Sequence, residues 1–155
     1  LTVDVDLTLL TGFGDEELYI NTLLREFGGR RADAGAFALR SRVLLLEDKS
    51  GVALDIALGA LPFEERSVAR SSAYEFAPGC RLRSCGAEDL IIHKCFANRD
   101  RDWADVEGVL ARNLRRLDFR LIRSELGALA ALKEDPAIPR KLDRMILEAR
   151  KAARR

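Results

Sequence analysis

Histidine and cysteine are scarce in this sequence of 155 residues, and their scarcity excludes several kinds of site. The chain has one histidine, His93, and three cysteines, which is an odd number. A disulfide framework needs paired cysteines, and a Cys/His zinc site needs more ligands than these. The sequence also disfavours a Ser/His/Asp hydrolase, because His93 is the sole candidate base. We therefore expect the cysteines to be small, buried hydrophobic residues.

Long apolar runs are absent as well. Runs such as residues 43–46 and 90–92 are far shorter than the roughly 20 residues that a membrane-spanning helix requires. No signal-peptide pattern is visible, so we expect a cytoplasmic protein with no membrane partner. Hydrophobic residues make up 48% of the chain and charged residues 33%, a balance that allows a buried core in one domain of ordinary size.

The net charge of +1 conceals an asymmetry along the chain. Residues 1–110 carry 13 Lys+Arg and 19 Asp+Glu, a net charge of −6, whereas residues 111–155 carry 13 and 6, a net charge of +7. An acidic first part and a basic last part are typical of a metal-binding half joined to an anion-binding half. Arginine-rich helices with a solvated face explain the same counts.

The hydrophobic periodicity predicts strands and a helix first, and then only helices. Alternation predicts a strand over residues 2–10, and a period near 3.6 predicts a helix over 15–27. Further strands are predicted over 36–47, 52–58, 73–76 and 80–84, with a turn at 48–51 and a short helix over 62–70; helices are predicted over 87–98, 100–113, 118–132 and 137–153. This order predicts an α+β core over residues 1–85 and a C-terminal helical bundle over 86–155.

Three aspartates are the first candidate site. Asp4 and Asp6 lie two residues apart on a predicted strand, so their carboxylates project from the same face. Val3, Val5 and Leu7 then turn to a core on the other face. Asp55 interrupts an apolar strand, where an unpaired buried acid is costly. Beside Asp4 and Asp6 it would complete a three-carboxylate site for Mg²⁺ or Mn²⁺. An alternating strand with one polar face also produces a D-x-D pattern by chance.

Lys94 is a second candidate. On the predicted helix 87–98 it shares a face with Leu90 and Ile91. Such a lysine either covers the core with its stem while its head reaches water, or places a point charge on a phosphate.

Four segments in this order resemble the nucleotidyltransferase superfamily of polymerase-beta-type folds. They are D-V-D-L at 4–7, L-D-I-A-L at 54–58, E-D-L-I-I-H-K at 88–94 and N-R-D-R-D-W-A-D-V at 98–106. Within the superfamily the chain is most similar to the abortive-infection (AbiEii-type) bacterial nucleotidyltransferases, several of which are toxins of toxin–antitoxin pairs. The resemblance implies a mixed β-sheet core and a cytoplasmic enzyme that moves NMP from an NTP to a hydroxyl acceptor.

The resemblance also implies roles for particular residues. Asp4, Asp6 and Asp55 would bind two metal ions, and Asp55 would help to deprotonate the acceptor. Lys94 and Arg101 would bind the nucleotide, and Asp102 and Asp105 would support them. The acceptor could be a tRNA end, a protein side chain or a small molecule, and an antitoxin would be a partner.

RNA is the acceptor that the basic C-terminal part favours, because phosphate contacts dominate the affinity of proteins for RNA. The arginines that could make these contacts recur at spacings of three and four residues: Arg112, Arg115, Arg116, Arg120 and Arg123.

One motif of the family has no counterpart in the sequence. A Gly-Gly or Gly-Ser pair that holds the nucleotide phosphates stands shortly before the D-x-D, which here begins at Asp4. Because the first residue is Leu1 and not methionine, we expect further residues upstream. The alternative is a non-catalytic member that binds a nucleotide or a partner protein, and a purely structural helical adaptor is a third interpretation.

Overall fold

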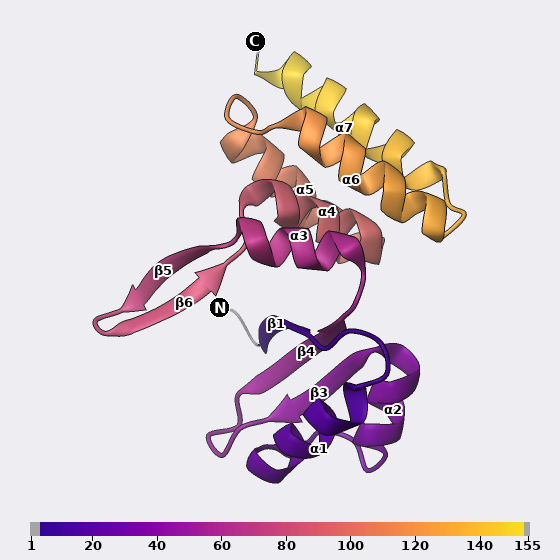
Figure 1. Ribbon diagram of the computed structural model, residues 1–155. Coiled ribbons are helices and arrows are strands. Elements are labelled where there is room, and N and C mark those ends of the chain that lie inside the picture. Colours follow the sequence, from indigo (N-terminus) through magenta and orange to yellow (C-terminus); the bar gives the residue numbers. More distant parts are fainter. Residues whose placement is uncertain (1–3, 154–155) are drawn as a thin grey trace. The chain divides into compact units, whose positions relative to one another are not determined.

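The computed structural model describes residues 4–153, which divide into two compact units between Ala69 and Arg70 (Figure 1). The first unit contains a mixed sheet with helices, and the second contains a hairpin followed by four helices. The predicted α+β class is therefore confirmed. Within the described range, no helix combines the length and the apolar character that crossing a membrane requires.

A four-stranded sheet organises the first unit. Its strands are β1 (Asp4–Leu10), β2 (Gly28–Gly29), β3 (Val43–Glu47) and β4 (Ala53–Gly59), in the spatial order β1-β4-β3-β2. Strand β1 runs parallel to β4, whereas the β3–β4 and β2–β3 pairs are antiparallel. The predicted turn at residues 48–51 joins β3 to β4 as expected, because the Asp48 carboxylate accepts backbone N–H bonds from Ser50 and Val52, both at 2.8 Å.

The hydrophobic core of this unit lies on one face of the sheet. Leu44 and Leu46 of β3 and Ile56 and Leu58 of β4 are buried there with residues of α1 (Glu16–Glu26) and α2 (Ala34–Ser41). Because side chains alternate along a strand, the residues between these four point to the opposite face. That opposite face carries the polar side chains of the candidate site.

The strand predicted over residues 36–47 is wrong in its first half. Residues 34–41 form helix α2, and only 43–47 form a strand. Ala34 and Ala38, one helical turn apart, are both buried in the core, so the buried residues of this segment follow a helical period and not the period of a strand. The helix ends where Arg42 adopts a left-handed conformation, with φ of 57°, and the chain then turns into β3.

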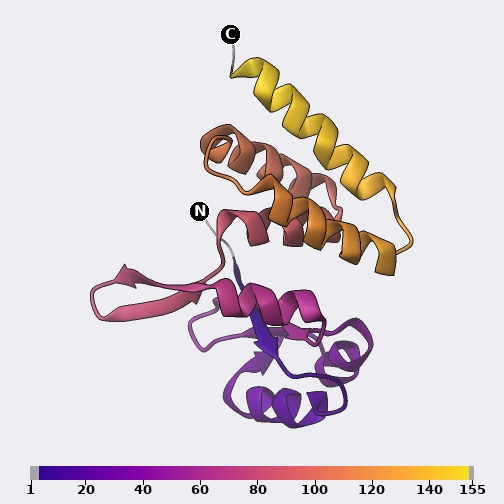
Figure 2. The same cartoon turned by 45° about the horizontal axis from the view of Figure 1, so that its top comes forward.

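The second unit begins with a two-stranded hairpin, β5 (Ser72–Ala77) and β6 (Cys80–Ser84), which pairs with no other strand of the sheet described above. Four helices follow and pack against one another, as Figure 2 shows; they are α4 (Ala87–Ala97), α5 (Asp100–Asn113), α6 (Phe119–Leu132) and α7 (Ala137–Ala152). These bounds confirm the predicted helices to within one or two residues. The boundary between units falls at Arg70, whereas the predicted domain boundary falls at 85/86.

Arg70 ends helix α3 (Pro62–Arg70) and forms a cluster of ion pairs inside the second unit. Its guanidinium donates to both oxygens of the Asp89 carboxylate, at 2.5 and 3.1 Å, and to Glu125 Oε1 at 3.0 Å. The side chains of Asp89 and Glu125 are only 3% and 8% exposed. The arginine therefore joins helices α4 and α6 through two buried carboxylates, which in turn raise the pKa of Arg70.

The three cysteines differ from the expectation that all are buried. Cys80 and Cys85 are exposed, and only Cys95 is buried in the core of the second unit. Burial raises the pKa of the Cys95 thiol to about 12, so its reactive thiolate is almost absent at neutral pH.

We expect a colorimetric thiol reagent to modify two cysteines of the folded protein at pH 8 and the third only after unfolding. Cys80 should react before Cys85, because partial desolvation and the nearby Asp89 raise the pKa of Cys85. Counting released chromophore with and without denaturant, and repeating the count with Cys95→Ala, measures this. Modification of three thiols in the folded protein would contradict the packing of α4.

Candidate functional site

The register of the first sheet brings the three predicted aspartates to one face. In the parallel pair β1–β4, Asp6 lies beside Asp55, and Asp4 lies beside Ala53, the residue two before Asp55. Neighbours in a parallel register point to the same side, and so do residues two apart on a strand. The side chains of Asp4, Asp6 and Asp55 therefore share the face of the sheet that lies opposite the core.

Strand β1 lies at the edge of the sheet, and β4 is its only neighbour among the strands that the structure describes. The loop after β1 anchors it there, because the N–H groups of Thr11 and Gly12 donate to the carbonyl of Gly59 at 2.9 and 3.1 Å. Gly59 leaves room for this approach: a Cβ atom on it would lie 3.1 Å from Leu10 and 3.2 Å from Thr8. These contacts hold the D-x-D strand in register with Asp55.

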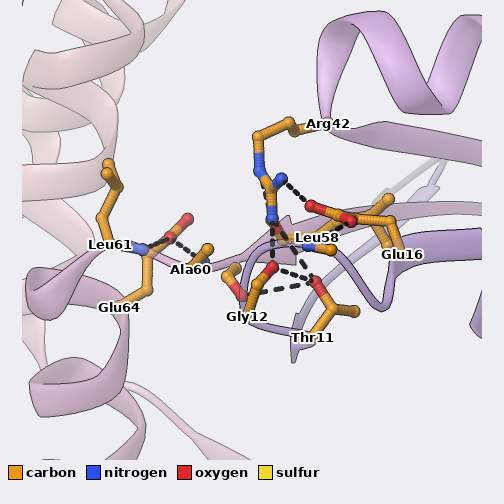
Figure 3. A network of polar contacts seen from close by, with 10 residues as sticks. Thr11, Gly12, Glu16, Arg42, Leu58, Ala60, Leu61 and Glu64 are labelled. Atoms are coloured by element: carbon orange, nitrogen blue, oxygen red, sulfur yellow. Dashed lines mark hydrogen bonds and ion pairs between the residues drawn. The ribbon is translucent and has the colours of Figure 1, made fainter.

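Arg42 binds the backbone at the C-terminal ends of β1 and β4 (Figure 3). Its guanidinium donates to the carbonyl of Leu58 at 2.6 and 2.9 Å and to the carbonyl of Gly12 at 3.0 Å. It also pairs with Glu16 at 2.5 Å, and this hydrogen bond is the main reason that the pKa of Glu16 lies below its usual value. The network fixes the loop but contains no carboxylate of the candidate site.

The edge position of β1 also corrects the expectation that Val5 and Leu7 point into a core. Both lie on the core side of the sheet, yet their side chains are 38% and 44% exposed. An edge strand has a neighbour on one side alone, so the helices that cover β3 and β4 leave β1 partly uncovered. Val3, which the same reasoning involves, lies outside the described residues.

Two charged residues of this face were not predicted from the sequence. Arg30 forms an ion pair with Asp55, and the two side chains are 30% and 28% exposed. Glu47 of β3 lies across Ala53 from Asp4 in the β1–β4–β3 register. The alternation of β3 could have indicated Glu47, but that strand was predicted to begin seven residues too early.

The donor chemistry of the face fits a hard divalent cation. Carboxylate oxygens are the ligands that Mg²⁺ and Mn²⁺ prefer, and Asp4, Asp6 and Asp55 supply them from two adjacent strands. In this structure Asp55 is engaged by Arg30. Over residues 4–153, no three His, Cys, Asp or Glu side chains converge closely enough to hold a metal ion. Rotation of the aspartate side chains is therefore needed before all three can bind the same metal ion.

The second unit brings together Lys94, Asp102 and Asp105. Lys94 Nζ lies 2.8 Å from Asp105 Oδ2 and 3.6 Å from Asp102 Oδ1. Asp102 is fully buried, whereas the side chain of Asp105 is 55% exposed. The lysine side chain itself is 26% exposed, so its ammonium group links helices α4 and α5 at the surface.

Arg99, and not Arg101, is the arginine that pairs with Asp102. The Asp102 carboxylate accepts from Arg99 Nε at 2.6 Å, from its Nη2 at 3.1 Å and from its backbone N–H at 3.2 Å. Burial alone would raise the pKa of Asp102, but the hydrogen bonds from Arg99 outweigh it and lower that pKa. Arg101 lies one residue inside α5 and is exposed.

The five candidate RNA-binding arginines are exposed but do not form one stripe. Arg112, Arg115 and Arg116 line an open groove of about 1030 Å³ between α5, the turn after it and α7. Arg123 of α6 instead pairs with Asp143 of α7 at 2.8 Å, and Arg120 lies in the first turn of α6. The break at Asp118, which begins α6, divides the set.

Comparison with known proteins adds no family to these observations. No protein-family model matches the chain, and no match is found among the curated proteins. The fold of the two units and the arrangement of their charged residues thus carry the functional argument.

Proposed function

We propose that the protein is a metal-dependent nucleotidyltransferase, with Asp4, Asp6 and Asp55 as its metal-binding residues. One observation supports this above the others: the parallel register sets Asp6 of β1 directly beside Asp55 of β4, with Asp4 on the same face. The nucleotidyltransferase resemblance names the same three residues from separate parts of the sequence. A purely structural helical adaptor has no need for three carboxylates on one sheet face, since like charges at this spacing repel.

In the proposed reaction, the acceptor oxygen forms a bond to the α-phosphorus of an NTP while the bond to the β-phosphate oxygen breaks. Pyrophosphate leaves, and the acceptor loses its hydroxyl proton. The bound divalent cations would neutralise phosphate charge and align the two oxygens. Asp4 and Asp6 would hold the cations in place, and Asp55 would accept the hydroxyl proton. Such a transfer depends mainly on positioning, which the neighbouring strands supply, and on charge neutralisation, which the bound cations would supply.

The acceptor in this proposal is an RNA, with tRNA as the first to test. The groove lined by Arg112, Arg115 and Arg116 offers clustered positive charge on the second unit. The binding of RNA to such a surface weakens steeply with salt, because phosphate contacts release counterions. Lys94 and Arg101 remain the predicted nucleotide contacts, and an antitoxin remains a predicted partner.

We expect Asp4→Asn combined with Asp6→Asn to abolish the binding of Mn²⁺ and NTP and all transfer of label. Calorimetry with Mn²⁺ and each NTP measures binding, and incubation of α-labelled NTPs with Mg²⁺ and total tRNA measures transfer. Glu17→Gln is the matched control, because Glu17 is an exposed acid on α1, outside the candidate site.

Unchanged metal and nucleotide binding in the double variant would refute the site. Binding that depends on Asp4 and Asp6, but without transfer to any acceptor, would support the alternative of a non-catalytic nucleotide-binding member. Thermal unfolding of each variant shows that a loss of binding is not a loss of fold.

A further inference from the structure

Arg30 lies in one row across the sheet with Asp6 and Asp55. Asp6 on β1 neighbours Asp55 on β4, and Asp55 neighbours Leu45 on β3. The backbone N–H of Arg30, directly after β2, donates to the Leu45 carbonyl at 3.1 Å. To pair with Asp55, the side chain of Arg30 extends across β3. Strand β3 lies about 4.8 Å from each of its two neighbouring strands.

The contact differs from those of the neighbouring arginine. Arg31 pairs with Asp33, two residues along its own loop, and lies over the ring of Phe37 at 4.4 Å. Arg30 reaches a carboxylate 25 residues away on another strand, and within residues 4–153 this is its only ion pair. Both partners are about 30% exposed, so water and ions reach the pair.

The pair has a clear electrostatic role on a face that carries Asp4, Asp6 and Asp55. Carboxylates on adjacent strands repel one another unless a cation lies near them. Arg30 supplies one positive charge, which a divalent cation would replace with two. The guanidinium occupies Asp55 Oδ1, so a metal that binds through this oxygen competes with Arg30.

We propose that Arg30 is a positioning residue that pairs with Asp55 until the metal and the nucleotide bind. Its guanidinium then leaves Asp55 and binds a phosphate of the nucleotide. This inference rests on the proposed function. A guanidinium presents a planar fork of donors that matches phosphate as well as carboxylate, so the released side chain exchanges one anionic partner for another. Its backbone stays fixed by the bond to Leu45.

The proposal predicts effects of opposite sign on two ligands. Arg30→Gln removes the competitor for Asp55, so the affinity for Mn²⁺ alone should rise about tenfold. The same change removes a phosphate contact, so the affinity for an α,β-methylene NTP in saturating Mn²⁺ should fall about tenfold. A residue that only stabilises the fold would shift both affinities in the same direction.

Electron paramagnetic resonance of free Mn²⁺ measures the first affinity, and calorimetry with the four α,β-methylene NTPs measures the second. Arg31→Gln is the matched control and should change neither. Combining Arg30→Gln with Asp55→Asn should cancel the gain in Mn²⁺ affinity, because the gain acts through Asp55. Arg30→Lys should recover part of the nucleotide affinity but not the forked contact.

The outcomes separate this inference from the function on which it rests. If Mn²⁺ binding depends on Asp4 and Asp6 but Arg30→Gln leaves it equal or weaker, the exchange is refuted and the metal site stands. If neither the natural protein nor Arg30→Gln binds Mn²⁺, the metal site and the exchange are both refuted. Tighter Mn²⁺ binding with unchanged nucleotide affinity refutes the transfer to phosphate.

Discussion

Replacing Arg70 with methionine should lower the free energy of unfolding by about 3 kcal/mol, because it leaves two buried carboxylates without their cation. Asp89 and Glu125 are 3% and 8% exposed, and Arg70 makes two hydrogen bonds to the first and one to the second. Methionine keeps most of the length and apolar stem of the side chain. The expected loss is at the low end for a buried pair, since the arginine is 29% exposed and water can enter.

Urea unfolding followed by circular dichroism measures this loss, and the melting temperature should fall by about 6–12 °C for a chain of this size. Arg123→Met is the matched control. It breaks a pair with Asp143 in which both side chains are about half exposed, so its cost should stay below about 1 kcal/mol.

A second comparison tests the electrostatic origin of the effect. Adding Asp89→Asn and Glu125→Gln to Arg70→Met removes the unpaired charges and should recover part of the lost stability. If the two added substitutions lower the free energy of unfolding further below that of Arg70→Met, then Arg70 acts through packing and not through charge.

Asp102→Ala should be the other strongly destabilising change, again by about 3 kcal/mol, because it removes the buried carboxylate that accepts charge-assisted hydrogen bonds from Arg99 and pairs with Lys94. The Asp102 carboxylate also accepts the Arg99 N–H at 3.2 Å and so caps the start of α5. Asp105→Asn is the matched control, since Asp105 pairs with the same lysine but is 55% exposed, and its cost should stay below about 1 kcal/mol.

The same residue predicts a dependence on pH. Its folded-state pKa is held below the ordinary value of 3.8, chiefly by the hydrogen bonds from Arg99 acting against burial. A carboxyl with a lowered folded pKa contributes stability above its unfolded pKa and loses that contribution as pH falls through the folded pKa. The difference in stability between the natural protein and Asp102→Asn should therefore be constant near neutral pH and shrink below pH 3.8.

Urea unfolding at about pH 7, 5, 4 and 3 checks this pH dependence. A stability difference that stays constant down to the lowest pH would mean that the charge of Asp102 contributes nothing, and that its role is only steric.

Local periodicity in the sequence determined most of the elements. The four C-terminal helices and the hairpin of residues 72–84 have patterns that depend on neighbours within a few residues, and the structure confirms them. The strand predicted over residues 36–47 was wrong in its first half because the apolar residues fit a period of two as well as a helical period. The burial of Ala34 and Ala38 on one helix face decided between the two periods. The shared face of Asp4 and Asp6 also followed from strand alternation alone.

The tertiary structure decided which distant residues meet. That Asp6 lies beside Asp55 depends on the parallel register of β1 and β4, which no local pattern specifies. Arg30 joins them because a two-residue strand, β2, sets its backbone across β3, and a loop arginine shows no sign of this in the sequence. Arg99, and not Arg101, pairs with Asp102 because α5 begins at Asp100, so that the residue before it caps the helix. Hydrophobic periodicity specifies the elements one by one, whereas strand register and helix ends, set by long-range packing and hydrogen bonds, decide which charges become partners.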